Sequence, residues 1–251
     1  MPEPSESTIL PEAAEPPPGP VQSLDDPRAV QILSTEHWSL LTARSLAYNE
    51  AFTRGGMFLT FLSTSFVALA FLAQAMTFDQ QFLVIAAIVL AFDFVIGLTT
   101  YGRIIGANSD DLRAVHGMAR IRHGYTQVAP VVAPYFTTGV NDDPRGVMIS
   151  YGNPPETYPG AFFYALTTSG GMIGLIVALV GGVLAGVLTL AVGASGSWAL
   201  VAGVIGAIAV FLLLFALTAG IIARTSASLP VLFPTSPTIE ADQADGISSN
   251  S

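Results

Sequence analysis

Two apolar runs, residues 57–76 and 82–101, stand out in the pattern of hydrophobic and polar positions along the chain. About 20 apolar residues in a helix are enough to cross the roughly 30 Å hydrocarbon core of a bilayer. The connection 77–81 is short, and lipid admits only helices or closed barrels. The pattern therefore predicts two antiparallel transmembrane helices joined by a tight turn.

A second apolar stretch, 161–223, predicts another transmembrane pair with crossings at 170–192 and 198–222, preceded by an interfacial aromatic belt at Phe162, Phe163 and Tyr164. Small residues let transmembrane helices approach closely, and the third crossing carries a row of glycines: Gly170, Gly174, Gly181, Gly182 and Gly186. This row indicates either packing of the third helix on the fourth or an interface between copies of the chain. We expect an all-α membrane protein with four transmembrane helices in two antiparallel hairpins.

Helical arms extend the first pair away from the bilayer. Ser34 or Thr35 is a good helix N-cap, and no proline interrupts the chain from there to residue 76. The second helix likewise runs on past residue 101, so that 34–127 forms one unit with two arms of matched length. We predict a cytosolic two-helix stalk with five large side chains on its inner faces, namely Trp38, Leu41, Tyr48, Phe52 and Val115.

Proline, glycine and acidic residues mark the remaining segments. Residues 1–33 are acidic and proline-rich, and residues 224–251 are polar. Both are expected to be disordered, because such segments cannot bury enough apolar surface to fold. Residues 128–160 predict a cytosolic Pro/Gly-rich loop, in which 146–151 is the candidate for a short strand. Loops of this length are often functional or mobile.

Composition narrows the classes of function. Only 11% of the residues are charged, against about 25% in ordinary soluble domains. The net charge of −9 argues against nucleic acid as a partner, because phosphates demand a basic surface. The chain has no cysteine and no lysine. This excludes disulfides and Cys-based metal centres, and also a Walker A lysine, a Schiff-base lysine and the lysine of a kinase.

The nine arginines predict the orientation in the membrane. They lie in the N-terminal segment, in 102–160 or in the C-terminal tail, and the two hairpin turns contain none. The positive-inside rule assigns arginine-rich segments to the cytoplasm. We therefore predict a multi-pass protein of the plasma membrane with both termini in the cytoplasm.

Asp93 breaks the apolar pattern of the second crossing. A carboxyl group at that depth costs a few kcal/mol and is read as functional by default. Folding the hairpin about its turn brings Asp93 level with Thr64, within a polar cluster made of Thr60, Ser63, Thr64 and Ser65. Two interpretations stay open: a hydrogen bond of neutral Asp93 that holds the two helices together, or a site for protons or cations.

The histidines, His37, His116 and His123, form no metal-binding pattern. His116 and His123 stand seven residues apart, whereas a zinc-binding pair on a helix is usually about four apart. No serine elbow accompanies them. We therefore expect no catalytic residue, no metal and no cofactor, and hence no enzyme. The pairs Asp110–Asp111 and Asp142–Asp143 fit helix-surface charge and turn chemistry.

Two stretches carry a family resemblance: Ser34-Thr-Glu-His-Trp-Ser-Leu-Leu-Thr-Ala-Arg-Ser-Leu-Ala-Tyr-Asn-Glu-Ala-Phe and Met118-Ala-Arg-Ile-Arg-His-Gly-Tyr. They are similar to a group of uncharacterised bacterial four-pass integral membrane proteins. The resemblance covers about residues 30–155 and implies no activity, ligand or catalytic residue. In architecture alone, the hairpin with cytosolic helices also resembles the SLATT-type membrane effectors of bacterial conflict systems.

Two classes of function fit these features. One is a non-catalytic membrane scaffold or adaptor whose stalk and tails present surfaces to cytosolic protein partners. The other is an oligomeric channel or transporter that uses Asp93 and the glycine-rich helices. The third and fourth crossings contain no ionisable residue, which disfavours transport. We favour the scaffold, with the lipid bilayer, a cytosolic protein and further copies of the chain as its candidate partners.

Overall fold

The computed structural model describes residues 21–76, 79–152 and 158–235. Within these residues the chain is helical and has no strand. Its elements are α1 (Pro27–Ala75), α2 (Gln80–Val128), the 3-10 helix η1 (Pro130–Tyr135), α3 (Pro144–Ser150), α4 (Tyr158–Thr167), α5 (Ser169–Ala191) and α6 (Gly196–Ala227). Four helices in this part of the chain, α1, α2, α5 and α6, are long and apolar enough to span a membrane. The predicted all-α class with four apolar helices is confirmed.

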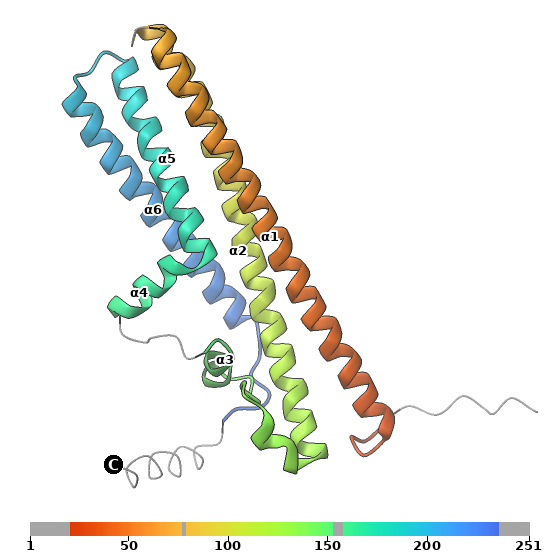
Figure 1. Ribbon diagram of the computed structural model, residues 1–251. Helices are drawn as coiled ribbons and strands as arrows, with labels where there is room; N and C mark the ends of the chain where they lie inside the picture. Colours follow the sequence, from red (N-terminus) through yellow and green to blue (C-terminus); the bar gives the residue numbers. More distant parts are fainter. Residues whose placement is uncertain (1–20, 77–78, 153–157, 236–251) are drawn as a thin grey trace, which may run out of the picture.

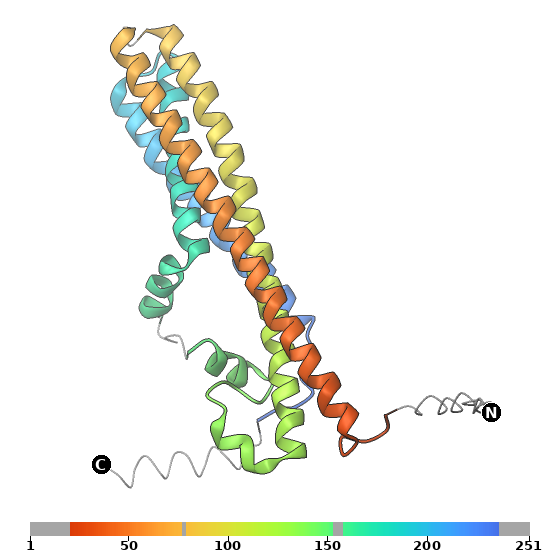
Figure 2. The same ribbon diagram turned by 45° about the vertical axis from the view of Figure 1, so that its right-hand side comes forward.

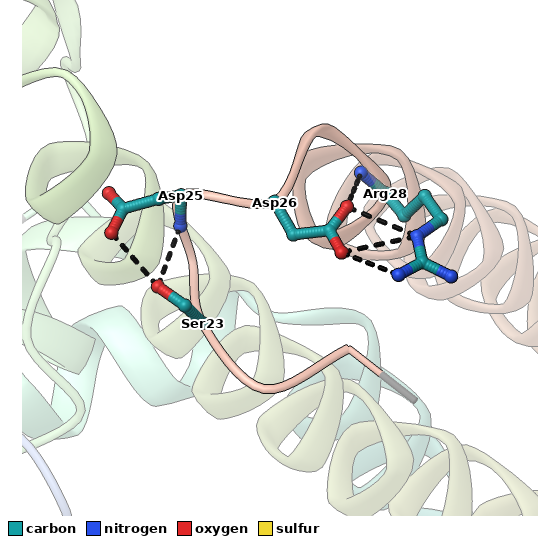
Figure 3. A network of polar contacts seen from close by, with 4 residues as sticks. All are labelled: Ser23, Asp25, Asp26 and Arg28. Atoms are coloured by element: carbon teal, nitrogen blue, oxygen red, sulfur yellow. Dashed lines mark hydrogen bonds and ion pairs between the residues drawn. The ribbon is translucent and has the colours of Figure 1, made fainter. Parts of the chain in front are cut away.

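Helix α1 begins earlier than the sequence predicts. Its N-cap is Asp26, whose carboxylate accepts hydrogen bonds from the Arg28 backbone N–H at 2.9 Å and from the Arg28 guanidinium at 2.7 Å (Figure 3). Pro27 follows at the first helical position, where its fixed φ suits the helix and its missing N–H costs nothing. The predicted cap at Ser34 or Thr35 is therefore wrong, and residues 27–33 are helical. Residues 1–20 lie outside the described residues.

The four long helices follow one another in space in their chain order. α1 packs on α2, α2 also packs on α5, and α5 packs on α6 (Figures 1 and 2). Tyr101 joins α2 to α6, because its hydroxyl lies 2.5 Å from the Thr218 hydroxyl and donates to the Leu214 carbonyl. Where α2 begins and α5 ends, the Gln80 side chain donates to the Ala191 carbonyl at 2.7 Å.

The contact between α1 and α2 has the periodicity of a coiled coil. Buried positions of α2 alternate in steps of four and three through Ala86, Leu90, Asp93, Gly97, Thr100, Ile104, Ala107, Asp111, Ala114, Met118 and Ile121. Those of α1 do the same through Ala51, Gly55, Phe58, Leu62 and Ser65. Such a repeat keeps one seam of each helix on its partner. On α2 the repeat runs without interruption from Ala86 to Ile121. At 1.5 Å per residue each 49-residue helix is about 74 Å long.

The arms, defined as residues 27–56 of α1 and 102–128 of α2, turn different side chains inward from those predicted. Trp38, Leu41 and Phe52 are 65%, 40% and 60% exposed, whereas Tyr48 is half-buried and Val115 is buried. Instead, Leu40 meets Gly117 and Leu33 meets Gly124. Two glycines of α2 leave room for these leucines, so the seam of α1 runs through Leu33 and Leu40. The predicted inner face is therefore wrong for Trp38, Leu41 and Phe52.

The predicted glycine row divides between two partners. A Cβ on Gly182 would lie 2.6 Å from the Gly203 carbonyl of α6, and one on Gly186 would lie 3.1 Å from the Ala199 carbonyl. Gly170 and Gly174 face α2 instead, with a Cβ on Gly174 reaching 2.8 Å from the Tyr101 ring. Gly181 touches both neighbours, through Phe94 of α2 and Val210 of α6. These glycines pack within the chain.

The segments that were expected to be irregular contain the short helices η1 and α3 and one segment, residues 230–235, that packs on the rest of the fold. Residues 146–151, the candidate strand, lie mostly in α3, which Asp143 caps. The apolar stretch from 161 is broken at Thr168, whose hydroxyl accepts the Gly171 N–H at 3.1 Å and starts α5, so that α4 is a separate helix. Beyond α6, residues 230–235 lie against α2 and the 139–143 loop. The prediction of disorder is therefore wrong for 224–235, and 236–251 lie outside the described residues.

Candidate functional site

Asp93 lies in the seam between α1 and α2. Its side chain has no exposed surface, and its Oδ1 accepts a hydrogen bond of 3.0 Å from the Ser65 hydroxyl. Among the described residues its Oδ2 has no hydrogen-bond partner. The predicted partner, Thr64, is one residue away from the observed one, Ser65.

The other members of the predicted polar cluster do not take part. The hydroxyls of Thr60, Ser63 and Thr64 are exposed and donate to carbonyl oxygens of their own helix, at 3.0, 2.8 and 2.9 Å. Hydroxyls in helices often bond back to the preceding turn in this way. The cluster is thus reduced to the pair Ser65 and Asp93.

The surroundings of this pair are apolar. One turn from Asp93, a Cβ on Gly97 would meet both Phe58 of α1 and Val177 of α5, so the pair lies where three helices converge. Ser65 also lines an apolar groove of about 720 Å³, together with Phe61 and Phe92. Asp93 itself does not line it. A polar residue at a seam position fixes the register of two helices, and Ser65 with Asp93 is placed to do so.

A second polar pair occupies the same seam in the arms. Asp111 is buried and pairs with Arg44. The Tyr151 hydroxyl, from the turn after α3, donates to Asp111 at 2.6 Å. Burial raises the pKa of the Tyr151 hydroxyl, and its hydrogen bond to Asp111 raises it further. Tyr151 therefore stays protonated and acts as a hydrogen-bond donor to the carboxylate.

Further buried or half-buried polar groups lie along the arms. The Arg122 guanidinium is buried and donates to the Gly139 carbonyl at 2.6 Å, and burial lowers its pKa. Burial also lowers the pKa of His37 and of His116. His123 stacks on Phe233. In the described part of the chain, no group of three or more His, Asp and Glu side chains is placed to hold a metal ion.

The third polar cluster holds residues 230–235, which we call the strap. Asp142 has no exposed surface, and its carboxylate accepts hydrogen bonds from the Arg120 guanidinium and from the backbone N–H groups of Leu232 and Phe233. Burial alone would raise the pKa of Asp142, but these hydrogen bonds outweigh it and hold the pKa below its usual range. Sequence reasoning assigned Asp142 to a turn, because nothing local connects it to a segment 90 positions away.

Comparison with known proteins adds no relative: no family model, no curated protein and no solved structure matches this chain. The resemblance to bacterial four-pass membrane proteins therefore stays an expectation. The features that bear on function are the polar clusters around Asp93, Asp111 and Asp142 and the surfaces beside them.

Proposed function

We propose that this chain is a non-catalytic membrane scaffold or adaptor of the plasma membrane. It crosses the bilayer four times in two antiparallel hairpins, and the arms of α1 and α2 project into the cytoplasm as a two-helix stalk. The observation that carries the proposal is the construction of the arms. The α2 arm continues the seam of the apolar part, and the buried charges Asp111 and Arg122 are paired within the fold.

The distribution of charge supports the orientation. Near the ends of the apolar runs, Glu50 pairs with Arg54 at 3.0 Å and with Arg103 at 2.6 Å. These side chains are exposed, as expected where helices leave a bilayer. Because arginine-rich segments stay in the cytoplasm, this end of the helices is assigned to the cytoplasmic side. A reporter fused after Ser251 should therefore be active inside the cell, and activity found only outside would contradict the orientation.

An uncovered apolar surface on the α1 arm supports the adaptor function. Val30, Trp38, Leu41 and Phe52 are all exposed on this arm. Among the described elements, η1 and α3 pack on α2 and not on α1 (Figure 2). Apolar surface that remains exposed outside a membrane often marks a protein–protein contact.

The alternative function, an oligomeric channel or transporter, is favoured by one observation, the unpartnered Oδ2 of Asp93. Against it, Asp93 lines none of the four described pockets. The groove beside Ser65 is apolar, as expected of a surface that faces lipid.

Flux measurements separate the two functions. Wild-type protein reconstituted in liposomes should carry no proton or cation current above that of empty liposomes. Asp93→Asn, which keeps the size and the hydrogen-bonding capacity of the side chain, should leave expression and thermal stability close to wild type. A wild-type proton or cation leak that disappears in Asp93→Asn would contradict the scaffold function and support the transporter function.

A further inference from the structure

The strap is held mainly through its main chain. The N–H of Leu232 lies 3.1 and 3.0 Å from the two carboxylate oxygens of Asp142, and the N–H of Phe233 donates to Oδ1 at 2.8 Å. The N–H of Thr235 donates to Asp143 at 3.1 Å. In the other direction, the Pro230 carbonyl accepts from Arg120, and the Phe233 carbonyl accepts from the Asp142 N–H at 3.4 Å. Because two consecutive N–H groups reach one carboxylate, the backbone bends at Leu232 and Phe233. Contacts of this kind depend on the course of the main chain more than on a particular sequence.

Phe233 provides the side-chain contact of the strap. Its ring stacks on that of His123 with centroids 4.2 Å apart. Val231 and Leu232, which precede it in the strap, are 46% and 55% exposed. The strap therefore buries little apolar surface beyond the ring of Phe233.

The groups that bind the strap are held in place by other parts of the fold. The Arg120 guanidinium donates to Asp142 at 2.7 Å. Asp143 caps α3 by accepting the Gly146 N–H at 3.0 Å through Oδ1, and offers Oδ2 to Thr235. Arg122 and the Ser150 hydroxyl fix the two polar groups of Gly139. The acceptors are thus pre-organised, which lowers the entropic cost of binding a peptide segment.

We propose that the strap is a self-ligand in a site that also binds a linear peptide of another chain. The partner segment bends as the strap does at Leu232 and Phe233, has two consecutive free N–H groups for Asp142, and places an aromatic ring on His123. This inference rests on the proposed adaptor function and names the kind of partner it takes at this face. A tethered segment competes at an effective concentration on the order of mM, so the strap keeps the site closed to weak ligands.

A fluorescent peptide tests the proposal on the full-length protein in detergent. The probe is the synthetic segment Leu-Pro-Val-Leu-Phe-Pro-Thr, which reproduces residues 229–235, and its binding is followed by anisotropy. Two variants weaken the strap: Leu232→Pro removes an N–H that Asp142 accepts, and Phe233→Ala removes the ring. Both should bind the peptide at least about tenfold more tightly than wild type, because the tethered competitor is weakened.

Two controls make the result specific. Val231→Pro should behave like wild type, since among the described residues the Val231 N–H donates to neither carboxylate. Adding Asp142→Asn to either strap variant should abolish the gained affinity. If neither strap variant gains affinity, or if the gain survives Asp142→Asn, the proposal is overturned. Neither result bears on ion flux, so the scaffold function is judged separately by the liposome measurement.

Discussion

Replacing Asp111 by Asn tests whether the buried pair in the arms stabilises the fold. The side chain keeps its size but loses its charge, and its amide then faces the donors of Arg44 and Tyr151. Asp111 is 2% exposed, and breaking a buried ion pair typically costs about 3–5 kcal/mol. The Arg44 side chain is 29% exposed and can recruit water. The expected loss is therefore nearer to about 2–3 kcal/mol, the strength of hydrogen bonds to a charged group.

The neighbouring residue offers a matched control. Asp110 pairs with Arg113 at 2.8 Å, but these side chains are 57% and 52% exposed, so Asp110→Asn should cost at most about 0.5 kcal/mol. Thermal unfolding in detergent, followed by circular dichroism, separates the two variants. A loss of about 2–3 kcal/mol lowers the Tm of a chain of this size by about 4–12 °C. Equal Tm values for the two variants would refute the distinction between a buried and a surface pair.

Two further predictions concern helix packing and pH. Gly182→Ala should lower the Tm, because its Cβ would lie 2.6 Å from a carbonyl of α6, whereas Gly220→Ala has open space and should raise it slightly through helix propensity; equal effects would contradict the close contact. Burial lowers the pKa of His116, a shift that Asp142 opposes and Arg120 reinforces. The neutral form is favoured in the fold, so stability is full above the ordinary histidine pKa near 6.5 and falls as the pH drops through it. His116→Gln should flatten that part of the Tm–pH curve, and an unchanged slope would contradict the assignment.

The sequence predicts the apolar helices better than it predicts their contacts. Runs of about 20 apolar residues are sufficient to place helices, since lipid leaves few alternatives. The sequence does not predict the inner face of the arms, because large apolar side chains such as Trp38 and Phe52 favour a core position, whereas here they are exposed. The seam instead pairs Leu40 and Leu33 with glycines, and such pairing becomes visible only when both helices are set side by side.

The site was predicted in part. Asp93 was singled out because a carboxylate is costly in lipid, and its partner was placed one residue from Ser65. Asp111 and Asp142 were read as surface charge and turn chemistry, because their partners are 67 and 90 positions away in the chain. The Asp26–Pro27 cap was not predicted, although an N-cap residue followed by proline is a local signal.

The seam between α1 and α2 has a mechanical consequence. Ser65–Asp93 and Arg44–Asp111 pin the same two helices at two levels that are 18 residues apart on α2, about 27 Å along its axis. A slide of α1 by one residue would separate both pairs at once and turn Arg44 off its carboxylate. Displacements that restore the packing come in steps of a helical turn, about 5.4 Å. We therefore expect helices α1 and α2 to be stiff and to move past each other only in discrete steps. A shift imposed at the turn between them is then transmitted to the far end of the arms.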